Sequence, residues 1–425
     1  MASSPSPRGQ HLLRADRGFA TGLGWLSRLS APGFHKFLDR LHAGLGSGRL
    51  EAKLPDGKTR VLGDHAPGVS AEIELKSWRP LIRLMTSGSI GWYRGWAEGE
   101  WTSPAPEKLF ELFVVNRKTL GNAARAKGAA RIRNLLAHTK RRNDRGNARK
   151  NIEAHYDLGN DFYEAWLDET MTYSSAVFGD PLSPAEPLEE AQRRKVRMLL
   201  DRLDLKPGHR LLEIGSGWGG LMEIAAKEYG ADVTGITLST EQKAFVEQRM
   251  RNAGLENRAR VELIDYRDVE GEFDAVASVE MVEAVGQEYW ATYMQAISDR
   301  LKPGGKAAIQ LISIEEDGFE AYASTADFIQ TYVFPGGMLI EEKRFAELGK
   351  QAGLTWADRT GYNLHYAETL RQWRERYDTA VADNSLPEGF DEPFHQFWRY
   401  YLMYCEGGFR AGGIDVAQVT LIKGK

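Results

Sequence analysis

A glycine-rich turn between an apolar strand and a helix constrains the fold of this chain more than any other feature. Residues 211–220 read LLEIGSGWGG, with four glycines in the last six positions. Glycines are needed where the backbone turns tightly and approaches a ligand closely. A turn of this kind, placed after a strand and opening a helix, is typical of sheets that bind a nucleotide-like cofactor.

Strand and helix patterns alternate on both sides of this turn. The Lys302-Pro303-Gly304-Gly305 segment is expected to turn the chain from the last helix into the last strand. Such alternation predicts an α/β fold with a doubly wound, Rossmann-like sheet whose ligand lies at the carboxyl ends of the strands. We expect strands at 211–214, 232–236, 260–264, 273–279 and 307–312, and helices at 219–229, 240–253 and 288–301.

Two details separate the candidate cofactors. Glu213 lies at the end of the first strand, where it can accept a hydrogen bond from an amino group of the ligand. The second strand ends in ITLS at 236–239, without the acidic residue that an NAD ribose requires. The E-x-G-x-G pattern on the first strand is typical of class I S-adenosylmethionine methyltransferases. A dinucleotide is the alternative that a bare glycine motif leaves open.

A smaller domain is expected ahead of this sheet. Residues 49–61 alternate apolar and polar side chains around Pro55-Asp56-Gly57, which indicates a hairpin, and 71–75 alternate again. Residues 78–85 are expected to be helical, and 88–101 place three Trp and one Tyr among glycines. We interpret these aromatic residues as core packing, with an apolar ligand pocket as the alternative. The expected domains are 1–116 (small α+β), 117–150 (basic helix and linker) and 151–425 (methyltransferase).

The linker is strongly basic. Residues 117–150 contain twelve Lys or Arg and a single acid, Asp144, although the whole chain has a formal net charge of −4. Such a segment is either a solvated helix and hinge or a contact for an anionic surface, with phospholipid head groups favoured over nucleic acid. No run of about 20 apolar residues predicts a membrane span. The single cysteine, Cys405, points to a reducing cytoplasm.

Four stretches extend the glycine turn into a family pattern. GSGWGG followed by GITLSTEQ (235–242) resembles the cyclopropane-fatty-acyl-phospholipid synthases and their mycolic-acid relatives. HYDLGNDFYEAWLDETMTYSS (155–175) looks like the entry motif of that family, and FIQTYVFPGG (328–337) resembles its lid-side signature. YYLMYCEGGFRAGGIDVAQ (400–418) is similar to its C-terminal end. The resemblance covers residues 151–425, and the 88–101 stretch also resembles the leading domain of the bacterial members.

The resemblance implies a cofactor, a substrate and a set of site residues. The cofactor is S-adenosylmethionine and the substrate an unsaturated acyl chain of a membrane phospholipid, to which a one-carbon unit is added across the C=C bond. The catalytic positions carried over by motif are Glu283, Tyr332, Cys405, Ser175 and Gln310. The expected cofactor residues are Tyr173, Ser174, Glu213, Gly215, Ser216, Gly217, Gly219, Thr237, Leu238, Ser239, Gln242, Tyr266 and Arg267.

Three positions depart from the family pattern. Ser175 replaces a cysteine, Gln310 a histidine, and Ala284 the histidine beside the active-site glutamate. The resemblance implies that the cysteine, histidine, tyrosine and glutamate positions of the family cradle a bicarbonate ion, the base that removes a proton from the added methyl group. In this sequence these positions are Ser175, Gln310, Tyr332 and Glu283. A hydroxyl and an amide still hydrogen-bond an anion, but Gln310 does not titrate. We therefore expect cyclopropane synthesis, with methylene- or methyl-branched chains as the alternative product.

The remaining expectations concern Cys405, metals and partners. No cationic group near Cys405 in the sequence would activate its thiol, so we interpret it as a wall of the site. The nine histidines show no metal-ligand spacing, and no metal is expected. The expected location is the cytoplasm, at the inner face of the membrane, with contact to anionic lipid, no nucleic acid, and a homodimer as a further partner. A nucleic-acid methyltransferase and a non-catalytic lipid-binding relative are the competing interpretations.

Overall fold

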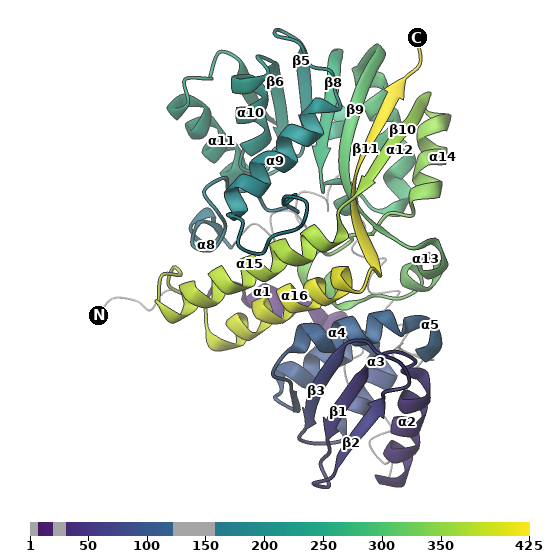
Figure 1. Cartoon of the computed structure of the whole chain (residues 1–425). Coiled ribbons are helices and arrows are strands. Elements are labelled where there is room, and N and C mark those ends of the chain that lie inside the picture. Colours follow the sequence, from purple (N-terminus) through teal and green to yellow (C-terminus); the bar gives the residue numbers. More distant parts are fainter. Residues whose placement is uncertain (1–6, 20–30, 122–157) are drawn as a thin grey trace, which may run out of the picture. The chain divides into compact units, whose positions relative to one another are not determined.

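The computed structural model describes residues 7–19, 31–121 and 158–425, and the chain forms two compact units (Figure 1). The first unit takes its described residues from Met1–Arg141, Gly318–Pro335 and Glu388–Ile414. The second takes them from Arg142–Asp317, Gly336–Pro387 and Asp415–Lys425. Two stretches of the expected methyltransferase domain therefore belong to the first unit. Most of the basic linker, residues 122–150, lies outside the described residues.

A small sheet organises the first unit. Its strand order is β2-β1-β3-β4, with β1 antiparallel to β2 and parallel to β3. The hairpin predicted around Pro55-Asp56-Gly57 is confirmed, because β1 and β2 pair from Lys53↔Thr59 outward. The strands are β1 (Arg49–Lys53), β2 (Thr59–Gly63), β3 (Ser70–Leu75) and β4 (Trp101–Thr102), and the helices are α1 (Gln10–Leu13), α2 (Ala31–Gly44), α3 (Arg79–Ala97), α4 (Pro106–Val115), α5 (Arg117–Leu120), α13 (Glu316–Ala323, from Gly318 onward) and α16 (Glu392–Arg410).

Helix α3 runs further than the sequence predicts. It continues to Ala97 and bends at Gly88, whose φ of 60° interrupts the helical backbone. The bend lets the aromatic residues that follow turn into the core: Trp92 stacks on Trp101 with ring centroids 4.6 Å apart, and Tyr93 is buried with them. The interpretation of this stretch as core packing is confirmed.

Helices α4 and α16 cross at a glycine of the C-terminal motif. A Cβ atom on Gly407 would lie 2.6 Å from the carbonyl oxygen of Glu107 and 2.7 Å from Cβ of Phe110. Real side chains do not approach backbone so closely, so the two helices pack at this distance only because residue 407 has no side chain. The neighbouring Gly408 is different, since its Cβ would meet Cδ1 of Ile414 at 3.3 Å.

Replacing Gly407 with alanine is therefore expected to lower the free energy of unfolding by about 2 kcal/mol, because α4 and α16 must move apart. Gly408→Ala is the matched control: a flexible side chain can yield there, and alanine favours a helix by about 1 kcal/mol over glycine. Urea unfolding followed by circular dichroism measures both variants. Equal stability of the two would contradict the close crossing.

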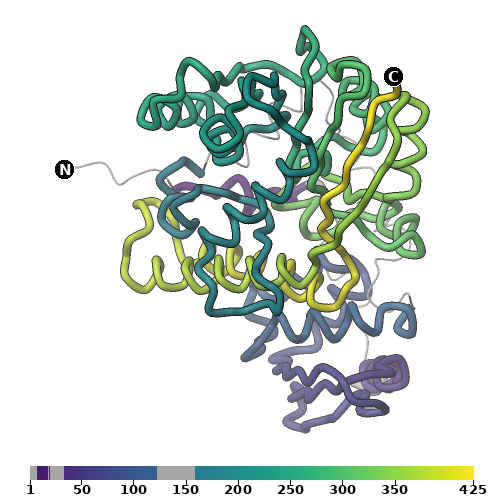
Figure 2. Tube along the Cα trace, turned by 45° about the horizontal axis from the view of Figure 1, so that its top comes forward, coloured from purple at the N-terminus to yellow at the C-terminus, as the bar shows by residue number. Residues whose placement is uncertain are grey.

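A seven-stranded sheet organises the second unit (Figure 1). Its strand order is β10-β11-β9-β8-β5-β6-β7; neighbours from β9 to β7 are parallel, and β10 is antiparallel to β11. The predicted doubly wound α/β fold is confirmed. Figure 2 shows the yellow C-terminal strand β11 running beside the yellow-green β10. The strands are β5 (Arg210–Ile214), β6 (Asp232–Thr237), β7 (Ala259–Leu263), β8 (Phe273–Val279), β9 (Leu301–Ile314), β10 (Leu354–Gly361) and β11 (Ile414–Lys423, from Asp415 onward).

Apolar faces of the helices cover this sheet. Side chains of α9, α10 and α11 form one core cluster with β5, β6 and β7, in which Leu199, Met222 and Val246 are fully buried. Helix α12 packs against β8, β9 and α14, and α14 against β10. The helices of this unit are α8 (Asn160–Glu164), α9 (Leu188–Asp201), α10 (Gly220–Glu228), α11 (Thr240–Asn252), α12 (Trp290–Arg300), α14 (Glu342–Gln351) and α15 (Asn363–Ala382).

The turn predicted at 302–305 is an irregularity inside a strand. Strand β9 already begins at Leu301, which pairs with Phe273, and the register then shifts so that Lys306 pairs with Ala275. The intervening residues are accommodated without ending the strand, since β8 offers a partner on both sides of them. Lys302 contributes an ion pair to Asp274.

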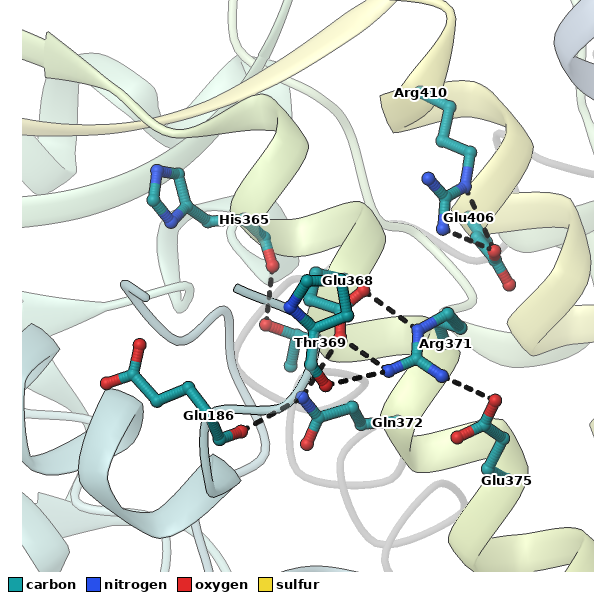
Figure 3. A network of polar contacts seen from close by, with 10 residues as sticks. Glu186, His365, Glu368, Thr369, Arg371, Gln372, Glu375, Glu406 and Arg410 are labelled. Carbon is teal, nitrogen blue, oxygen red and sulfur yellow. Dashed lines mark hydrogen bonds and ion pairs between the residues drawn. The ribbon is translucent and has the colours of Figure 1, made fainter. Parts of the chain in front are cut away.

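Helix α15 holds a loop of the second unit through polar contacts (Figure 3). Arg371 pairs with Glu368 and Glu375 on its own helix, and the amide of Gln372 donates to the backbone oxygen of Glu186. Thr369, whose hydroxyl donates to the backbone oxygen of His365, also accepts from the backbone amide of Ala176 at 3.1 Å, in the loop before α9.

Candidate active site

The expected site residues of the second unit gather along the carboxyl edge of its sheet. β5 ends at the glycine turn, β6 ends at Thr237, and the segment after β7 carries Tyr266 and Arg267. β8 leads into a 3-10 helix with Glu283, and β9 contains Gln310 opposite Val279 at the end of β8. In an open parallel sheet this edge is where ligands bind.

The glycine turn has the geometry of a ligand cradle. Gly215, Gly217 and Gly219 all have positive φ angles. Among the described residues, apart from Gly217 and its two chain neighbours, no heavy atom lies within 4 Å of where a Cβ on Gly217 would be. The amides of Gly215 and Ser216 both donate to the backbone oxygen of Ile236, which joins the turn to the end of β6. The turn is thus held by β6 and leaves open space at its tip.

Glu213 is buried next to this turn with an unused acceptor. Its Oε2 atom has no hydrogen-bond partner in the described part of the chain. Burial raises the pKa of Glu213 well above its usual range, and the positive charges of Lys195 and Arg249 oppose that rise only in part. An unpaired buried carboxyl group of this kind fits an amino group of a ligand.

The expected cofactor residues after β6 mostly form hydrogen bonds with one another. The hydroxyl of Thr237 donates to the side-chain oxygen of Gln242 at 2.8 Å, and the hydroxyl of Ser239 accepts from the amide of Gln242 at 3.2 Å as the N-cap of α11. Leu238 lies between them, partly buried. These contacts fix the backbone of residues 237–239 at the rim of the site.

The expected pair after β7 is held by an acid that the sequence analysis did not select. Arg267 makes two short contacts to Asp265, from Nε to Oδ1 at 2.7 Å and from Nη2 to Oδ2 at 2.6 Å. Its charge is therefore neutralised within the segment. The hydroxyl of Tyr266 is buried and has no hydrogen-bond partner among residues that the structure describes, so it remains available to a ligand.

Tyr173 and Ser174 lie on the loop before α9. Tyr173 packs against Trp373 and Tyr163, with ring centroids 5.2 and 5.4 Å apart. The hydroxyl of Ser174 accepts from the ammonium of Lys195 at 2.6 Å. Lys195 is fully buried, and burial lowers its pKa to about 8.

Ser175 and Gln310, two of the departures from the family pattern, meet on one carboxylate. Oε1 of Glu280 accepts from the backbone amide of Ser175 at 2.8 Å and from Nε2 of Gln310 at 2.8 Å. Oε2 of the same residue accepts from the hydroxyl of Tyr366 at 2.6 Å. The structure therefore brings the two expected positions together around an acidic side chain of this chain. We refer to Glu280, Ser175, Gln310 and Tyr366 as the Glu280 cluster.

Glu283, the expected active-site glutamate, lies three residues after Glu280. Its Oε1 accepts from the backbone amide of Ile312, and its backbone oxygen accepts from the amide of Met338 at 2.8 Å. Oε2 of Glu283 is buried and unpartnered within the described ranges. Burial, together with the negative charge of Glu280, raises the pKa of Glu283 to about 8. Its carboxyl group therefore carries a proton at neutral pH.

Tyr332 and Cys405, the other two expected catalytic residues, belong to the first unit. Tyr332 lies in a π-helix (Ile329–Val333), with its ring 4.7 Å from Tyr93 and 5.4 Å from Phe328. Burial raises the pKa of Tyr332 well above its usual range, and Asp16 adds to that rise.

Cys405 lies on α16 and is not activated in the first unit. Burial raises the pKa of its thiol, and the negative charge of Asp327 adds to the rise. A thiol in this environment is a poor nucleophile. The interpretation of Cys405 as a wall of the site remains a prediction.

Sequence reasoning missed Glu280, Tyr366 and Lys195. A signal for Glu280 was present, since it directly follows the predicted strand 273–279 and so falls at the ligand edge of the sheet. Lys195 gave no signal, because a lysine within a basic helix pattern is typical of a solvated face. Tyr366 lies on a helix nearly 90 residues further along the chain, and nothing local marks it.

The sheet order, the glycine turn and the unpaired Glu213 together define a class I S-adenosylmethionine-dependent methyltransferase. Comparison with known proteins gives the family. The model of the family described as mycolic acid cyclopropane synthetase matches residues 143–419, and this chain belongs to that family.

Curated relatives span several activities. The chain is 46% identical over 284 residues to the tuberculostearic acid methyltransferase of Mycobacterium tuberculosis, which is 66% of this chain and 66% of that relative. It is 33% identical over 359 residues to the cyclopropane-fatty-acyl-phospholipid synthase of Escherichia coli, which is 83% of this chain and 88% of that relative. It is 34% identical to a probable fatty acid methyltransferase of Pseudomonas putida, over 76% of this chain and 84% of the relative.

Comparison with solved structures gives the same family. The cyclopropane synthase MmaA2 of Mycobacterium tuberculosis matches with a TM-score of 0.60 and 31% identity, over 65% of this chain and 98% of that chain. The mycolic acid cyclopropane synthase CmaA1, in complex with SAH and CTAB, matches with the same values. The predicted resemblance, the enzyme class and the cofactor S-adenosylmethionine are thereby confirmed. The matched region includes the Glu280 cluster and the glycine turn.

Proposed function

We propose that this protein transfers a methyl group from S-adenosylmethionine to a C=C bond in an acyl chain of a membrane phospholipid and releases a methylene-branched chain. The observation that carries the proposal is the Glu280 cluster. The resemblance implies a cradle for an external anion at positions 175 and 310. Instead, the backbone amide of Ser175 and the side chain of Gln310 donate hydrogen bonds to the carboxylate of Glu280.

The residues at the sheet edge fit the cofactor. Bound S-adenosylmethionine supplies a methyl group on a positively charged sulfur, which an alkene can attack when the two are aligned. Glu213 would accept from the amino group of the cofactor through its unpaired Oε2 atom. The open tip of the glycine turn at Gly217 would admit the cofactor close to the backbone, and the buried hydroxyl of Tyr266 would complete the rim.

The product depends on how fast a proton leaves after the methyl group has been added. Addition leaves a carbocation on the acyl chain, and prompt proton removal from the new methyl group closes a ring. Three hydrogen bonds stabilise the charge of the Glu280 carboxylate, so it removes a proton more slowly than the same buried group would without them. A hydride shift then has time to occur, and proton loss gives a methylene branch. The relative at 46% identity is itself named a methyltransferase of tuberculostearic acid.

Cyclopropane synthesis is the second candidate. It is favoured by the match to the Escherichia coli synthase, which is named for that reaction and extends over 83% of this chain, into the first unit. The roles of Tyr332 and Cys405 as walls of the acyl-chain site belong to either product and remain predictions.

Membrane phospholipid is proposed as the substrate on two grounds. The Escherichia coli relative is named for phospholipid, and the basic segment 117–150 suits an anionic head-group surface. Within residues 7–19, 31–121 and 158–425, no helix combines the length and the apolar composition that crossing a bilayer requires. We therefore propose contact with the membrane surface.

Proton NMR of lipids after incubation with the purified protein and S-adenosylmethionine tests the product. Vesicles of unsaturated phospholipid are expected to give new vinylidene signals, because a methylene branch is formed. Cyclopropane and methylene products are isomers, so mass alone does not separate them. High-field ring-methylene signals would instead establish the second candidate. Unchanged lipid, with the cofactor bound, would exclude both candidates for this lipid, and incubation without cofactor is the control.

A further inference from the structure

The Glu280 cluster contains a base that neither the family comparison nor the motifs assign. We propose that the carboxylate of Glu280 itself removes the proton from the newly added methyl group, in place of an external bicarbonate ion. The inference rests on the proposed methyl transfer to an acyl chain and adds to it the identity of the proton acceptor.

The hydrogen bonds of Glu280 leave one position for a proton. A carboxylate has about four acceptor positions on its two oxygens. Oε1 uses two of them, for the amide of Ser175 and for Nε2 of Gln310. Oε2 accepts from the hydroxyl of Tyr366 and keeps one further lone pair. That lone pair is where a C–H proton can be received.

Gln310 is oriented so that it can only donate toward Glu280. Its Nε2 donates both to Oε1 of Glu280 and to the backbone oxygen of Ser175 at 3.1 Å, while its Oε1 accepts from Nε2 of Gln418 at 3.1 Å. Gln418 in turn donates to the backbone oxygen of Lys195 at 3.1 Å. Every atom of the Gln310 amide is thus engaged, and its donor end is fixed on the carboxylate. Such outer contacts preserve the geometry of a reacting group.

The backbone at Glu280 is held in a strained conformation. Its φ is 48°, a left-handed value that side chains other than glycine rarely adopt. The amide of Glu280 donates to the backbone oxygen of Gln310 at 2.8 Å, so the two residues are joined through both backbone and side chain. Strain that the surrounding structure maintains is common at functional sites. It also means that glycine can replace Glu280 without disturbing the backbone.

The charges around Glu280 suit a base. Burial raises its pKa, which makes the carboxylate a better proton acceptor than a solvated glutamate. The hydrogen bond from Tyr366 and the positive charge of Lys195 oppose that rise and stabilise the ionised form. The neighbouring Glu283 has a pKa of about 8 and holds its proton at neutral pH, so it adds no second negative charge.

The proposed step is balanced without a further reactant. One C–H bond of the added methyl group breaks, and the proton forms an O–H bond at Oε2 of Glu280. The electron pair of the broken bond forms the π bond of a methylene group, or the last C–C bond of a ring, and neutralises the carbocation. Glu280 returns the proton to solvent before the next turnover.

The test compares three forms of the full-length protein with unsaturated phospholipid vesicles in carbon-dioxide-free buffer. Wild type is expected to turn over at the same rate with and without added bicarbonate. Glu280→Gly is expected to lose about a hundredfold in turnover. Formate or bicarbonate should restore part of that activity, since a small carboxylate fits the vacated space. Glu280→Gln fills the same space with a neutral group, so it should be equally slow and not restored by either anion.

Calorimetric binding of S-adenosylmethionine serves as the control for folding, and all three proteins are expected to bind it equally. Wild-type turnover that requires bicarbonate, or a Glu280→Gln protein as fast as wild type, would overturn the assignment. If wild type gives no lipid product at all, the proposed function fails rather than the identity of the base. These two failures are therefore distinguishable.

Tyr366→Phe supplies a further measurement, the pH dependence of the rate, which would not change if Glu280 had only a structural role. Loss of the hydroxyl removes a hydrogen bond that lowers the pKa of Glu280, so the acidic side of the rate profile should move to higher pH by about one unit. Tyr362→Phe, one helical turn before it, is the matched control and should leave the profile in place. An unmoved profile in Tyr366→Phe, together with no rescue of Glu280→Gly, would assign Glu280 to structure alone.

Discussion

Replacing Glu213 with glutamine is expected to weaken the binding of S-adenosylmethionine about a hundredfold at pH 8, because a charge-assisted hydrogen bond is worth up to about 3 kcal/mol. In the cofactor-free protein, burial raises the pKa of Glu213 well above its usual value of 4.5, which favours the protonated carboxyl group. An amino group carrying a positive charge favours the carboxylate. Binding should therefore release a proton.

This linkage gives a pH dependence with a definite sign. The affinity of the wild-type protein should rise with pH, by up to about tenfold per unit, until the raised pKa is passed. Isothermal titration calorimetry in two buffers of different ionisation enthalpy measures the released proton directly. Glu213→Gln should bind without proton release and with little pH dependence. Glu256→Gln changes an exposed glutamate of the same unit and is the control.

The stability of the cofactor-free protein should change in the opposite sense. A carboxyl group whose pKa is raised on folding stabilises the protein fully only below pH 4.5, and this contribution is lost as the pH rises toward the folded value. The Glu213→Gln protein should therefore melt at a higher temperature than wild type at pH 8 but not at pH 4. A variant that loses both stability and affinity at pH 8 would show that Glu213 supports the fold instead of the cofactor.

Replacing Glu283 with glutamine is expected to lower turnover by about a hundredfold or more while leaving cofactor affinity unchanged. A pKa of about 8 lies near the working pH, so Glu283 changes its protonation state within the range in which turnover is measured. Glutamine preserves the hydrogen bond to the amide of Ile312 but carries no exchangeable acid proton. The inflection that Glu283 contributes to the rate profile near pH 8 should therefore disappear in the variant.

Steady-state rates between about pH 6 and pH 9 measure both the loss of turnover and the loss of the inflection, because this range brackets the pKa of Glu283. The exposed-side neighbour Glu288, in the following 3-10 helix, provides the control as Glu288→Gln. Turnover of Glu283→Gln at the wild-type rate would remove Glu283 from the chemistry, whatever its place in the family motif.

Local patterns predicted the five strands β5 to β9 because each carries its own signal, whereas β10 and β11 were not predicted. The strand at 273–279 and the helix beginning at 240 match β8 and α11 at those positions, since apolar strands and an N-cap serine define them locally. The 302–305 turn was mistaken for a boundary because glycines also mark bulges, and only a pairing strand distinguishes the two.

From the sequence, only the site residues that lie within recognised motifs could be predicted. Ser175 and Gln310 were selected as altered positions, but nothing in their neighbourhood identifies what they contact. Their partner Glu280 and its donor Tyr366 come from separate parts of the chain, and a carboxylate in SVEMVE gives the same sequence signal whether it is Glu280 or Glu283. Only the structure shows that Glu280 is the one that contacts Ser175 and Gln310.

The place of β11 in the sheet has a consequence for how the protein is made. β11 lies between β9 and β10 but is translated after both. On the ribosome, the edge of β9 therefore waits without its final neighbour, and an unpaired edge invites association with other chains. Gln418, which orients Gln310, arrives on this same strand. Gln418 is translated long after the glycine turn and Glu280, so the contact that orients Gln310 toward Glu280 is the last of these features to become available.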